Sequence, residues 1–233
     1  MINRLINFLK WYKYEYSGKA STQETYEMIS KDLNYDKTID FTERKIALSN
    51  LFSINDIKDK KILDLACGTG AFISAVIDKN PKKIVGVDLT EGMLNIARKR
   101  FVNDKRITFI NKSFMDVDFK EGSFDLILLA NASRYIPFGE EKRFFTNIRR
   151  WLKKDSVFVI HSDFWGGSFG KLMAPIIKLV TNKKYLNPNT TFDWTLEKEL
   201  HKYFSIFKKE YIKEITGASM HLAFFCKTNN QKS

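Results

Sequence analysis

The stretch from Lys61 to Phe72, KILDLACGTGAF, constrains the fold of this chain more than any other. It begins with a short apolar run typical of a buried strand and continues from Ala71 with the apolar spacing of a helix. Between these parts, Gly68 and Gly70 permit a tight turn and let a ligand approach backbone that lacks a Cβ atom. A strand, a glycine turn and a helix in this order aim free backbone N–H groups and the positive helix end at a ligand.

Three kinds of nucleotide-binding loop compete for this stretch. A P-loop needs Lys and then Ser or Thr after its last glycine, where this chain has Ala71 and Phe72, so that hypothesis is excluded. A dinucleotide-binding loop favours a third glycine three residues beyond Gly70, where Ile73 would hinder passage of the pyrophosphate. The remaining pattern, an acid at the strand end followed by two glycines one residue apart, resembles motif I of the class I S-adenosylmethionine-dependent methyltransferases. Ala66 replaces the usual first glycine of that motif.

A second element stands at the spacing that this resemblance requires. Ile84 to Asp88 is another short apolar strand that ends in an acid, and Asp88 follows Gly70 by 18 residues. A carboxylate at this distance can accept hydrogen bonds from both ribose hydroxyls. The resemblance also implies that Leu89 contributes to the cofactor site and that Met93, at the start of the next helix, packs on the adenine. A core methionine on an amphipathic helix is the alternative role for Met93, and the two roles are compatible.

Two further strands complete the pattern. The run from Ile107 to Asn111 is the third, and the resemblance places Ser113 where many family members have an acid that holds the adenine amino group. The backbone N–H of Phe114 is the alternative contact there. The run from Phe124 to Asn131 resembles motif IV, whose strand end lies beside the methionine part of the cofactor and the substrate. Four elements in this order make the resemblance stronger than any one glycine loop would.

The resemblance further implies which residues surround the methionine end of S-adenosylmethionine. Asp64 and the carbonyl of Ala130 would orient the amino group of the cofactor, the first through water. Tyr35 opens a Tyr-Asp pair 29 residues before Asp64, and in many small-molecule members such a tyrosine helps to enclose the cofactor. We therefore expect Tyr35, Asp64 and Ala130 to lie together around the methionine end of the cofactor.

Two side chains near the expected ligand edge are candidate catalytic residues. Tyr135 lies in the loop after the fourth strand, and His161 ends the fifth. With an unperturbed pKa of about 6.5, a histidine there could accept a proton from a hydroxyl or ammonium substrate. The alternative for His161 is a structural hydrogen bond to a neighbouring loop. The sulfonium methyl is already activated, so a base is needed only if the acceptor arrives protonated.

The length of 233 residues suits one domain with a good core. The resemblance implies a doubly wound, Rossmann-like, mainly parallel α/β sheet of seven strands, with helices on both faces and the last strand antiparallel. Residues 1–50 are expected to form an N-terminal helical lid or cap. Residues 163–190 are expected to be a variable, apolar insertion on the substrate side, suited to the wall of a pocket.

The C-terminal part is predicted to contain one helix and a terminal hairpin. We expect the helix over Asp193 to Phe204, with Thr195 as a plausible cap. The hairpin is expected from Tyr211 to Thr216 and from His221 to Thr228. The turn of this hairpin should face the ligand side, which makes His221 a second candidate base.

Cysteine usage and hydropathy indicate a soluble, cytoplasmic protein. The two cysteines, Cys67 and Cys226, make no disulfide framework and have no metal-site partners at ligand spacing, so no metal is expected. No secretory signal is visible, and the longest later apolar run is too short to span a bilayer. Residues 1–16 form an apolar helix face with basic neighbours, which suits a lid, a dimer contact or a membrane-surface helix. Peripheral membrane contact and the oligomeric state stay open.

The net charge of +12 raises the question of an acidic partner, but the excess is spread along the chain. No motif of base-modifying methyltransferases is present, and nucleic acid is therefore not the expected partner. The favoured function is methyl transfer to O or N of a small, partly hydrophobic metabolite by in-line displacement. The alternatives are methylation of a lipid head group or membrane-bound isoprenoid, and a non-catalytic cofactor-binding domain that acts through a protein partner.

Overall fold

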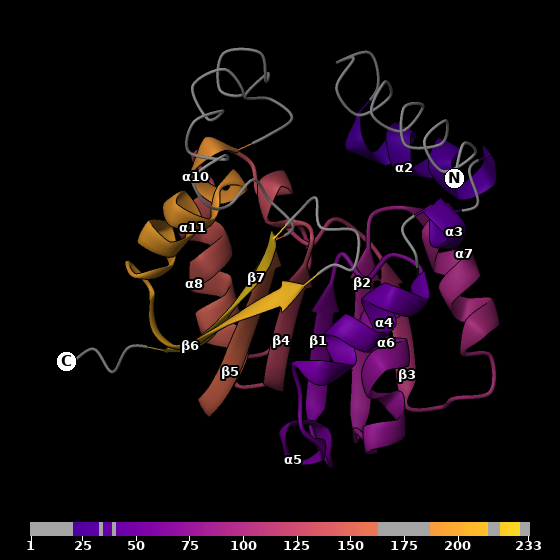
Figure 1. Cartoon of the computed structure of the whole chain (residues 1–233), viewed down its shortest axis with the longest axis horizontal. Coiled ribbons are helices and arrows are strands. Elements are labelled where there is room, and N and C mark those ends of the chain that lie inside the picture. Colours follow the sequence, from indigo (N-terminus) through magenta and orange to yellow (C-terminus); the bar gives the residue numbers. More distant parts are fainter. Residues whose placement is uncertain (1–20, 33–34, 39–40, 163–186, 214–219, 229–233) are drawn as a thin grey trace.

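The computed structural model describes residues 21–32, 35–38, 41–162, 187–213 and 220–228 (Figure 1). In these ranges, the helices before the first strand are α2 (Thr22–Asp32), α3 (Tyr35–Thr38), α4 (Phe41–Asn50) and α5 (Ile54–Ile57). The matched region then gives β1 (Lys61–Leu65), α6 (Ala71–Val76), η1 (Ile77–Lys79), β2 (Lys83–Asp88), α7 (Glu91–Arg100), β3 (Ile107–Asn111), β4 (Phe124–Ala130) and η2 (Ser133–Tyr135). The elements that follow are α8 (Glu141–Trp151), β5 (Leu152–Ser162), α10 (Pro188–Thr191), α11 (Asp193–Leu200), β6 (Phe204–Lys213) and β7 (Met220–Thr228).

The strands form one seven-stranded sheet in the order β3-β2-β1-β4-β5-β7-β6. Strands β1 to β5 are parallel to one another, and β7 is antiparallel to both β5 and β6. The predicted doubly wound, mainly parallel sheet with an antiparallel last strand is therefore confirmed. The chain order reverses between β1 and β4, and open α/β sheets bind ligands outside the carboxyl ends of the strands at such a point.

Helices cover both faces of the sheet (Figure 1), because the central strands are apolar on both sides. Successive side chains of β1 point to opposite faces. Leu63 and Leu65 pack in one core with residues of α8 and α11, while Ile62 packs in the other with residues of α4, α5 and α6. This double burial fixes the register of β1, so Asp64 near its end and the glycine turn after it are held at the carboxyl edge.

The C-terminal elements differ from the prediction. Helix α11 ends at Leu200, and Phe204 begins β6 with its ring buried against Phe145 and Phe158. The sequence hid this strand because the register shifts between Ile206 and Lys208, which breaks the apolar alternation of an edge strand. The predicted hairpin therefore pairs strands that begin at 204 and 220, and residues 214–216 lie outside the described part.

Two finer predictions in this region are wrong. Phe192, not Thr195, is the N-cap residue of α11, and the Thr195 hydroxyl donates to the Phe192 carbonyl from inside the helix at 3.0 Å. The sequence predicts the fifth strand from Ser156 to His161, but β5 begins four residues earlier, at Leu152. The side chain of His221, most of the 163–190 insertion and residues 1–20 lie outside the described part, so those predictions stay predictions.

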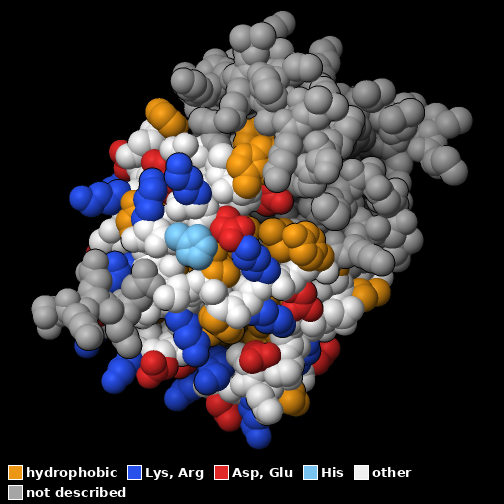
Figure 2. Space-filling model, turned by 60° about the vertical axis from the view of Figure 1, so that its left-hand side comes forward, with side chains coloured by type: hydrophobic (Ala, Val, Ile, Leu, Met, Phe, Trp, Pro, Cys, Tyr) orange, Lys and Arg blue, Asp and Glu red, His pale blue; other side chains and the backbone are white. Residues whose placement is uncertain are grey.

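Surface charge is mixed over the face shown in Figure 2, where Lys and Arg side chains alternate with acidic and apolar ones. Several surface charges of the described residues are paired, as in the contact between Arg150 and Asp118 and the 2.6 Å contact between Lys202 and Glu199. Among the helices of the described ranges, none has the length and hydropathy needed to cross a membrane.

Candidate functional site

A cavity of about 390 Å³ opens at the carboxyl edge of the parallel strands. Its walls are the turns after β1, β2, β3 and β4, together with residues of α2, α3 and α4. The predicted cofactor-binding residues that line it are Tyr35, Asp64, Ala66, Gly68, Asp88, Leu89, Met93, Ser113, Phe114 and Ala130. Tyr135 also lines it, whereas Gly70 and His161 are not among its described lining residues.

Every second residue in the turn after β1 has a left-handed backbone conformation. Ala66, Gly68 and Gly70 have φ angles of 55°, 53° and 87°, which L side chains rarely adopt. A Cβ atom on Gly70 would lie 2.6 Å from a ring carbon of Phe101, while none of the surrounding atoms would crowd one on Gly68 within 4 Å. Gly70 is therefore required for packing behind the turn, and Gly68 leaves bare backbone facing the cavity.

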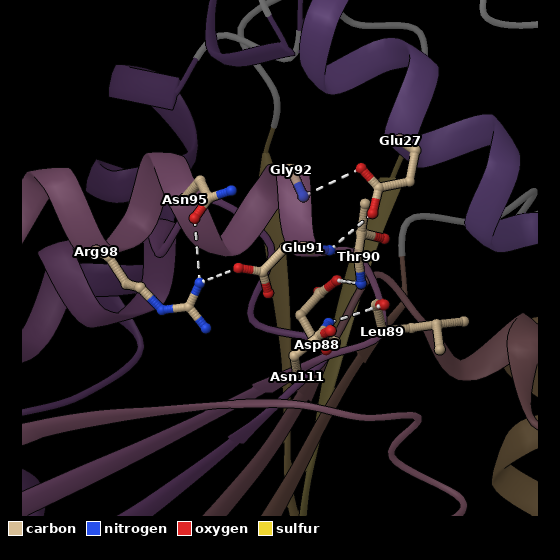
Figure 3. Close-up of polar contacts among 9 residues, drawn as sticks. All are labelled: Glu27, Asp88, Leu89, Thr90, Glu91, Gly92, Asn95, Arg98 and Asn111. Carbon is tan, nitrogen blue, oxygen red and sulfur yellow. Dashed lines mark hydrogen bonds and ion pairs between the residues drawn. The ribbon is translucent and has the colours of Figure 1, made fainter.

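Asp88 fixes this turn from the neighbouring strand. Its carboxylate accepts the Gly68 N–H at 2.8 Å and the Thr90 N–H at 2.9 Å. Asn111 then ties β3 to the same place, because its amide donates to the carbonyls of Asp88 and Leu89 at 3.1 and 3.0 Å (Figure 3). Burial raises the pKa of Asp88, and the hydrogen bonds from Thr90 and Gly68 oppose that rise.

Asp64 is the buried carboxylate of the site. Its side chain is 1% exposed, and its Oδ2 atom has no hydrogen-bond partner among the described residues. Burial, and after it the charge of Asp88, raise the pKa of Asp64 well above its ordinary value. Leaving a buried carboxylate oxygen without a donor is costly, so this atom suits a cationic group of a ligand. Clusters of three or more His, Cys, Asp or Glu side chains suited to a metal are not found within the described ranges.

The Tyr-Asp pair upstream of β1 is fastened to the glycine turn. Asp36 accepts the Thr69 hydroxyl at 2.6 Å and forms an ion pair with Arg100, which also donates to the Thr69 carbonyl. The Arg100 guanidinium lies 3.9 Å from the centroid of the Phe41 ring. Asp36 therefore holds α3 against the turn, and this attachment brings Tyr35 to the cavity wall.

The cavity wall near β3 contains both apolar and polar side chains. Met93 is 1% exposed and packs with Ile29 of α2, so it is a core residue that also contributes to the cavity wall. Phe114 makes an edge-to-face contact with Phe144. The Ser113 hydroxyl accepts the Met115 N–H at 3.1 Å, which uses one acceptor site within its own turn.

The far end of the cavity lies beside the loop after β4. The hydroxyl groups of Tyr135 and Tyr26 are 3.0 Å apart, and the two rings meet edge to face. With the Asn131 amide turned to satisfy its neighbours, its nitrogen faces Nδ1 of His161 at 2.7 Å and its oxygen accepts the Arg44 guanidinium at 3.0 and 3.1 Å. His161 thus lies behind the wall, 3% exposed, while Asn131 and Arg44 line the cavity.

Sequence reasoning missed several lining residues. They come from α2, from α4, from the turn after β3 and from α8: Tyr26, Arg44, Asp116 and Arg143. A single polar residue on a helix predicts only a solvated face, and the packing of α2 and α4 over the sheet edge is a tertiary feature. Asp116 could have been noticed as the acid nearest to the position where the resemblance gave Ser113.

Comparison with known proteins agrees with this geometry. Residues 62–155 match the family described as "Methyltransferase domain". The chain is similar to the ubiquinone/menaquinone biosynthesis C-methyltransferase UbiE of Campylobacter jejuni, with 31% identity over 142 residues that cover 58% of this chain and 57% of that protein. It is also similar to the demethylmenaquinone methyltransferase of Thermotoga maritima, with 29% identity over 70% of this chain and 63% of that protein. The chain therefore spans less than two thirds of the length of these curated relatives.

Solved structures support the same fold. A SAM-dependent methyltransferase from Leishmania major superposes with a TM-score of 0.68 at 12% identity, covering 88% of this chain and 81% of that one. At such low identity the likeness concerns the fold alone.

Proposed function

We propose that the chain is a class I S-adenosylmethionine-dependent methyltransferase, whose cavity binds S-adenosylmethionine and which transfers the methyl group to a small, partly hydrophobic metabolite. One observation carries this proposal. The glycine turn, which is hydrogen-bonded to Asp88, and the buried carboxylate of Asp64 line the same cavity. A cavity of about 390 Å³ suits a small ligand.

The residues present fit the cofactor at each of its ends. Asp88 has a free lone pair on each carboxylate oxygen for a ribose hydroxyl, and Met93 with Phe114 offers apolar surface for the adenine. Oδ2 of Asp64 would accept the ammonium group, and the Arg44 guanidinium would pair with the carboxylate. When bound, S-adenosylmethionine supplies an activated sulfonium methyl group.

The chain itself then has to align an acceptor and exclude water. Well-oriented reactants can gain roughly 7 to 11 kcal/mol from proximity alone. Tyr26 and Tyr135 form the wall at the acceptor end, where a hydroxyl of the pair can donate a hydrogen bond to an acceptor oxygen. His161 would act on the acceptor only through Asn131, so we propose Tyr135 as the contacting residue and His161 as the group behind it.

The atom that receives the methyl group is a separate question. Oxygen or nitrogen suits the chemistry proposed from the sequence, whereas the similarity to proteins named as quinone C-methyltransferases favours a ring carbon of a quinol-like acceptor. A carbon acceptor needs an ionised oxygen on the ring to push electron density toward that carbon, and Arg143 lines the cavity as a cation that would stabilise such an anion. The same cavity would also serve an acceptor carried on a lipid, or a non-catalytic binding role through a protein partner.

The first test is calorimetric titration of wild type and Asp88→Ala with S-adenosylmethionine and S-adenosylhomocysteine. We expect wild type to bind both and the variant to bind much more weakly. Asp78→Ala is the matched control, because Asp78 is exposed on η1 and remote from the cavity lining. Absence of binding by a folded wild-type protein would overturn the proposal. Binding would justify a screen of metabolite extracts and of quinol analogues for radiolabelled methyl transfer.

A further inference from the structure

Helix α7 receives its N-terminal cap from another helix. Its own N-cap residue, Thr90, makes no side-chain cap hydrogen bond. Instead the carboxylate of Glu27, on α2, accepts the Glu91 N–H at 2.8 Å and the Gly92 N–H at 3.1 Å (Figure 3). The first N–H groups of a helix have no partner within the helix, and a carboxylate there also interacts favourably with the helix dipole. One side chain therefore satisfies two free donors from 64 and 65 residues away.

The two helices approach closely at Gly92. A Cβ atom on Gly92 would lie 2.0 Å from Oγ of Ser30 and 2.8 Å from Oε2 of Glu27. Real Cβ atoms essentially never approach other atoms that closely, so a side chain on Gly92 would displace the Ser30 hydroxyl and the Glu27 carboxylate. Next to this contact, Ile29 of α2 packs on Met93 of α7 with both side chains buried.

This contact lies between Asp88, proposed to hold the ribose, and Met93, proposed to pack on the adenine. Thr90, just before the capped turn, is held by Asp88, and Met93, just after it, lines the cavity. On the other side of α2, the residue before Glu27 is Tyr26, whose hydroxyl meets that of Tyr135. Helix α2 is thus attached at the adenosine end and at the acceptor end of the same cavity, and it forms part of the wall between them.

We propose that Glu27 is a positioning residue that caps α7 from α2, and so holds α2 closed over bound cofactor and fixes the turn from Asp88 to Met93. The inference rests on the proposed function, because it assigns the adenosine end of that site. Loss of the cap frees two donors at the turn and removes the attachment that keeps α2 in place. Bound cofactor should therefore dissociate faster when Glu27 is replaced.

The test measures S-adenosylhomocysteine binding and dissociation rates for wild type, Glu27→Ala, Glu27→Gln and Gly92→Ala. Because the cap is lost, we expect Kd to rise roughly tenfold in Glu27→Ala, mostly through a faster dissociation rate. Glu27→Gln keeps one acceptor oxygen and should be intermediate. Gln23→Ala is the control, because Gln23 is exposed on the same helix and outside the cavity lining.

Two further readouts separate positioning from a general loss of stability. In ligand-free protein, amide exchange at Glu91 and Gly92 should quicken in Glu27→Ala, while the strands keep wild-type protection. In the double variant Glu27→Ala with Gly92→Ala, the two effects on Kd should be less than additive, because both act through one contact. A Kd in Glu27→Ala within twofold of wild type would overturn the inference alone. A wild-type protein that binds no S-adenosylhomocysteine would overturn the proposed function instead.

Discussion

Ala66 is strained in a way that its neighbours in the turn are not. Gly68 and Gly70 adopt positive φ at little cost, whereas Ala66 does so at 55° with a Cβ atom present. The sequence showed that a small residue replaces the usual glycine of motif I, and the structure shows that the backbone there keeps the glycine-like conformation. The strain is local to the cavity wall.

We predict that Ala66→Gly stabilises the folded protein by about 1 kcal/mol, because the strain it removes exceeds the entropy it adds to the unfolded chain. Urea unfolding would measure the change in free energy of unfolding. Ala47→Gly, in the ordinary helix α4, should instead lose about 1 kcal/mol. A destabilised Ala66→Gly protein would show that the alanine methyl makes a packing contact worth more than the strain.

The buried Asp64 predicts a particular dependence of stability on pH. Its folded pKa lies well above its unfolded value, so between the two the folded state binds more protons than the unfolded state. The free energy of unfolding should therefore fall as the pH rises from about 4 through the folded pKa. Asp88 contributes in the same direction, since its pKa is also raised.

We predict that Asp64→Asn is more stable than wild type at neutral pH and less dependent on pH, yet binds S-adenosylmethionine more weakly. The gain follows from removing a charge that folding must bury, and the loss follows from removing the acceptor for the ammonium group. Urea unfolding between about pH 4 and pH 8 checks the first part, and calorimetry checks the second. Equal stability of the two proteins at neutral pH would contradict the assignment of a raised pKa.

The helices and strands that local sequence patterns determine were predicted. Strands β1, β2, β3 and β4 matched because apolar runs ending in a polar residue are visible without a fold. Strand β6 did not, because Lys208 and Lys209 on an edge strand have no apolar period, and only the pairing with β7 defines the strand. Likewise the Tyr-Asp pair could be recognised in the sequence, but the contacts of Asp36 could not. They form only when α3 packs against Thr69 in the glycine turn and Arg100 on α7.

Helix α3 should therefore depend on one carboxylate. We predict that Asp36→Asn loosens both α3 and the glycine turn and weakens S-adenosylhomocysteine binding, by roughly tenfold if the ion pair and the bond to Thr69 are both impaired. Asp78→Asn, an exposed acid on η1, is the control for removal of one negative charge. Binding at the wild-type level would mean that α3 is held by other contacts.

For the whole molecule, the site proved more predictable than its surroundings. Ten predicted cofactor residues line one cavity, since the parallel strands bring their carboxyl ends together whatever the helices do. The residues that cover that edge, Tyr26, Glu27 and Arg44, were not predicted, because nothing local distinguishes them from solvated helix positions. The position of His161 behind Asn131 was also not predicted, because it depends on how β5 and the loop after β4 pack.

If the chain is a single domain, a ligand in the cavity should stabilise all of it together. The cavity takes its walls from the turns after four strands and from helices before and between them, so bound ligand contacts most of the sheet edge. At a concentration of 100 times Kd, S-adenosylhomocysteine should add about 2.7 kcal/mol, which for a chain of this size raises Tm by roughly 5 to 10 °C in one cooperative transition. Differential scanning calorimetry measures both quantities, and Asp88→Ala should show a smaller shift at the same ligand concentration. Two transitions, of which the ligand moved only one, would mean that part of the chain folds as a separate unit and that the cavity belongs to the other.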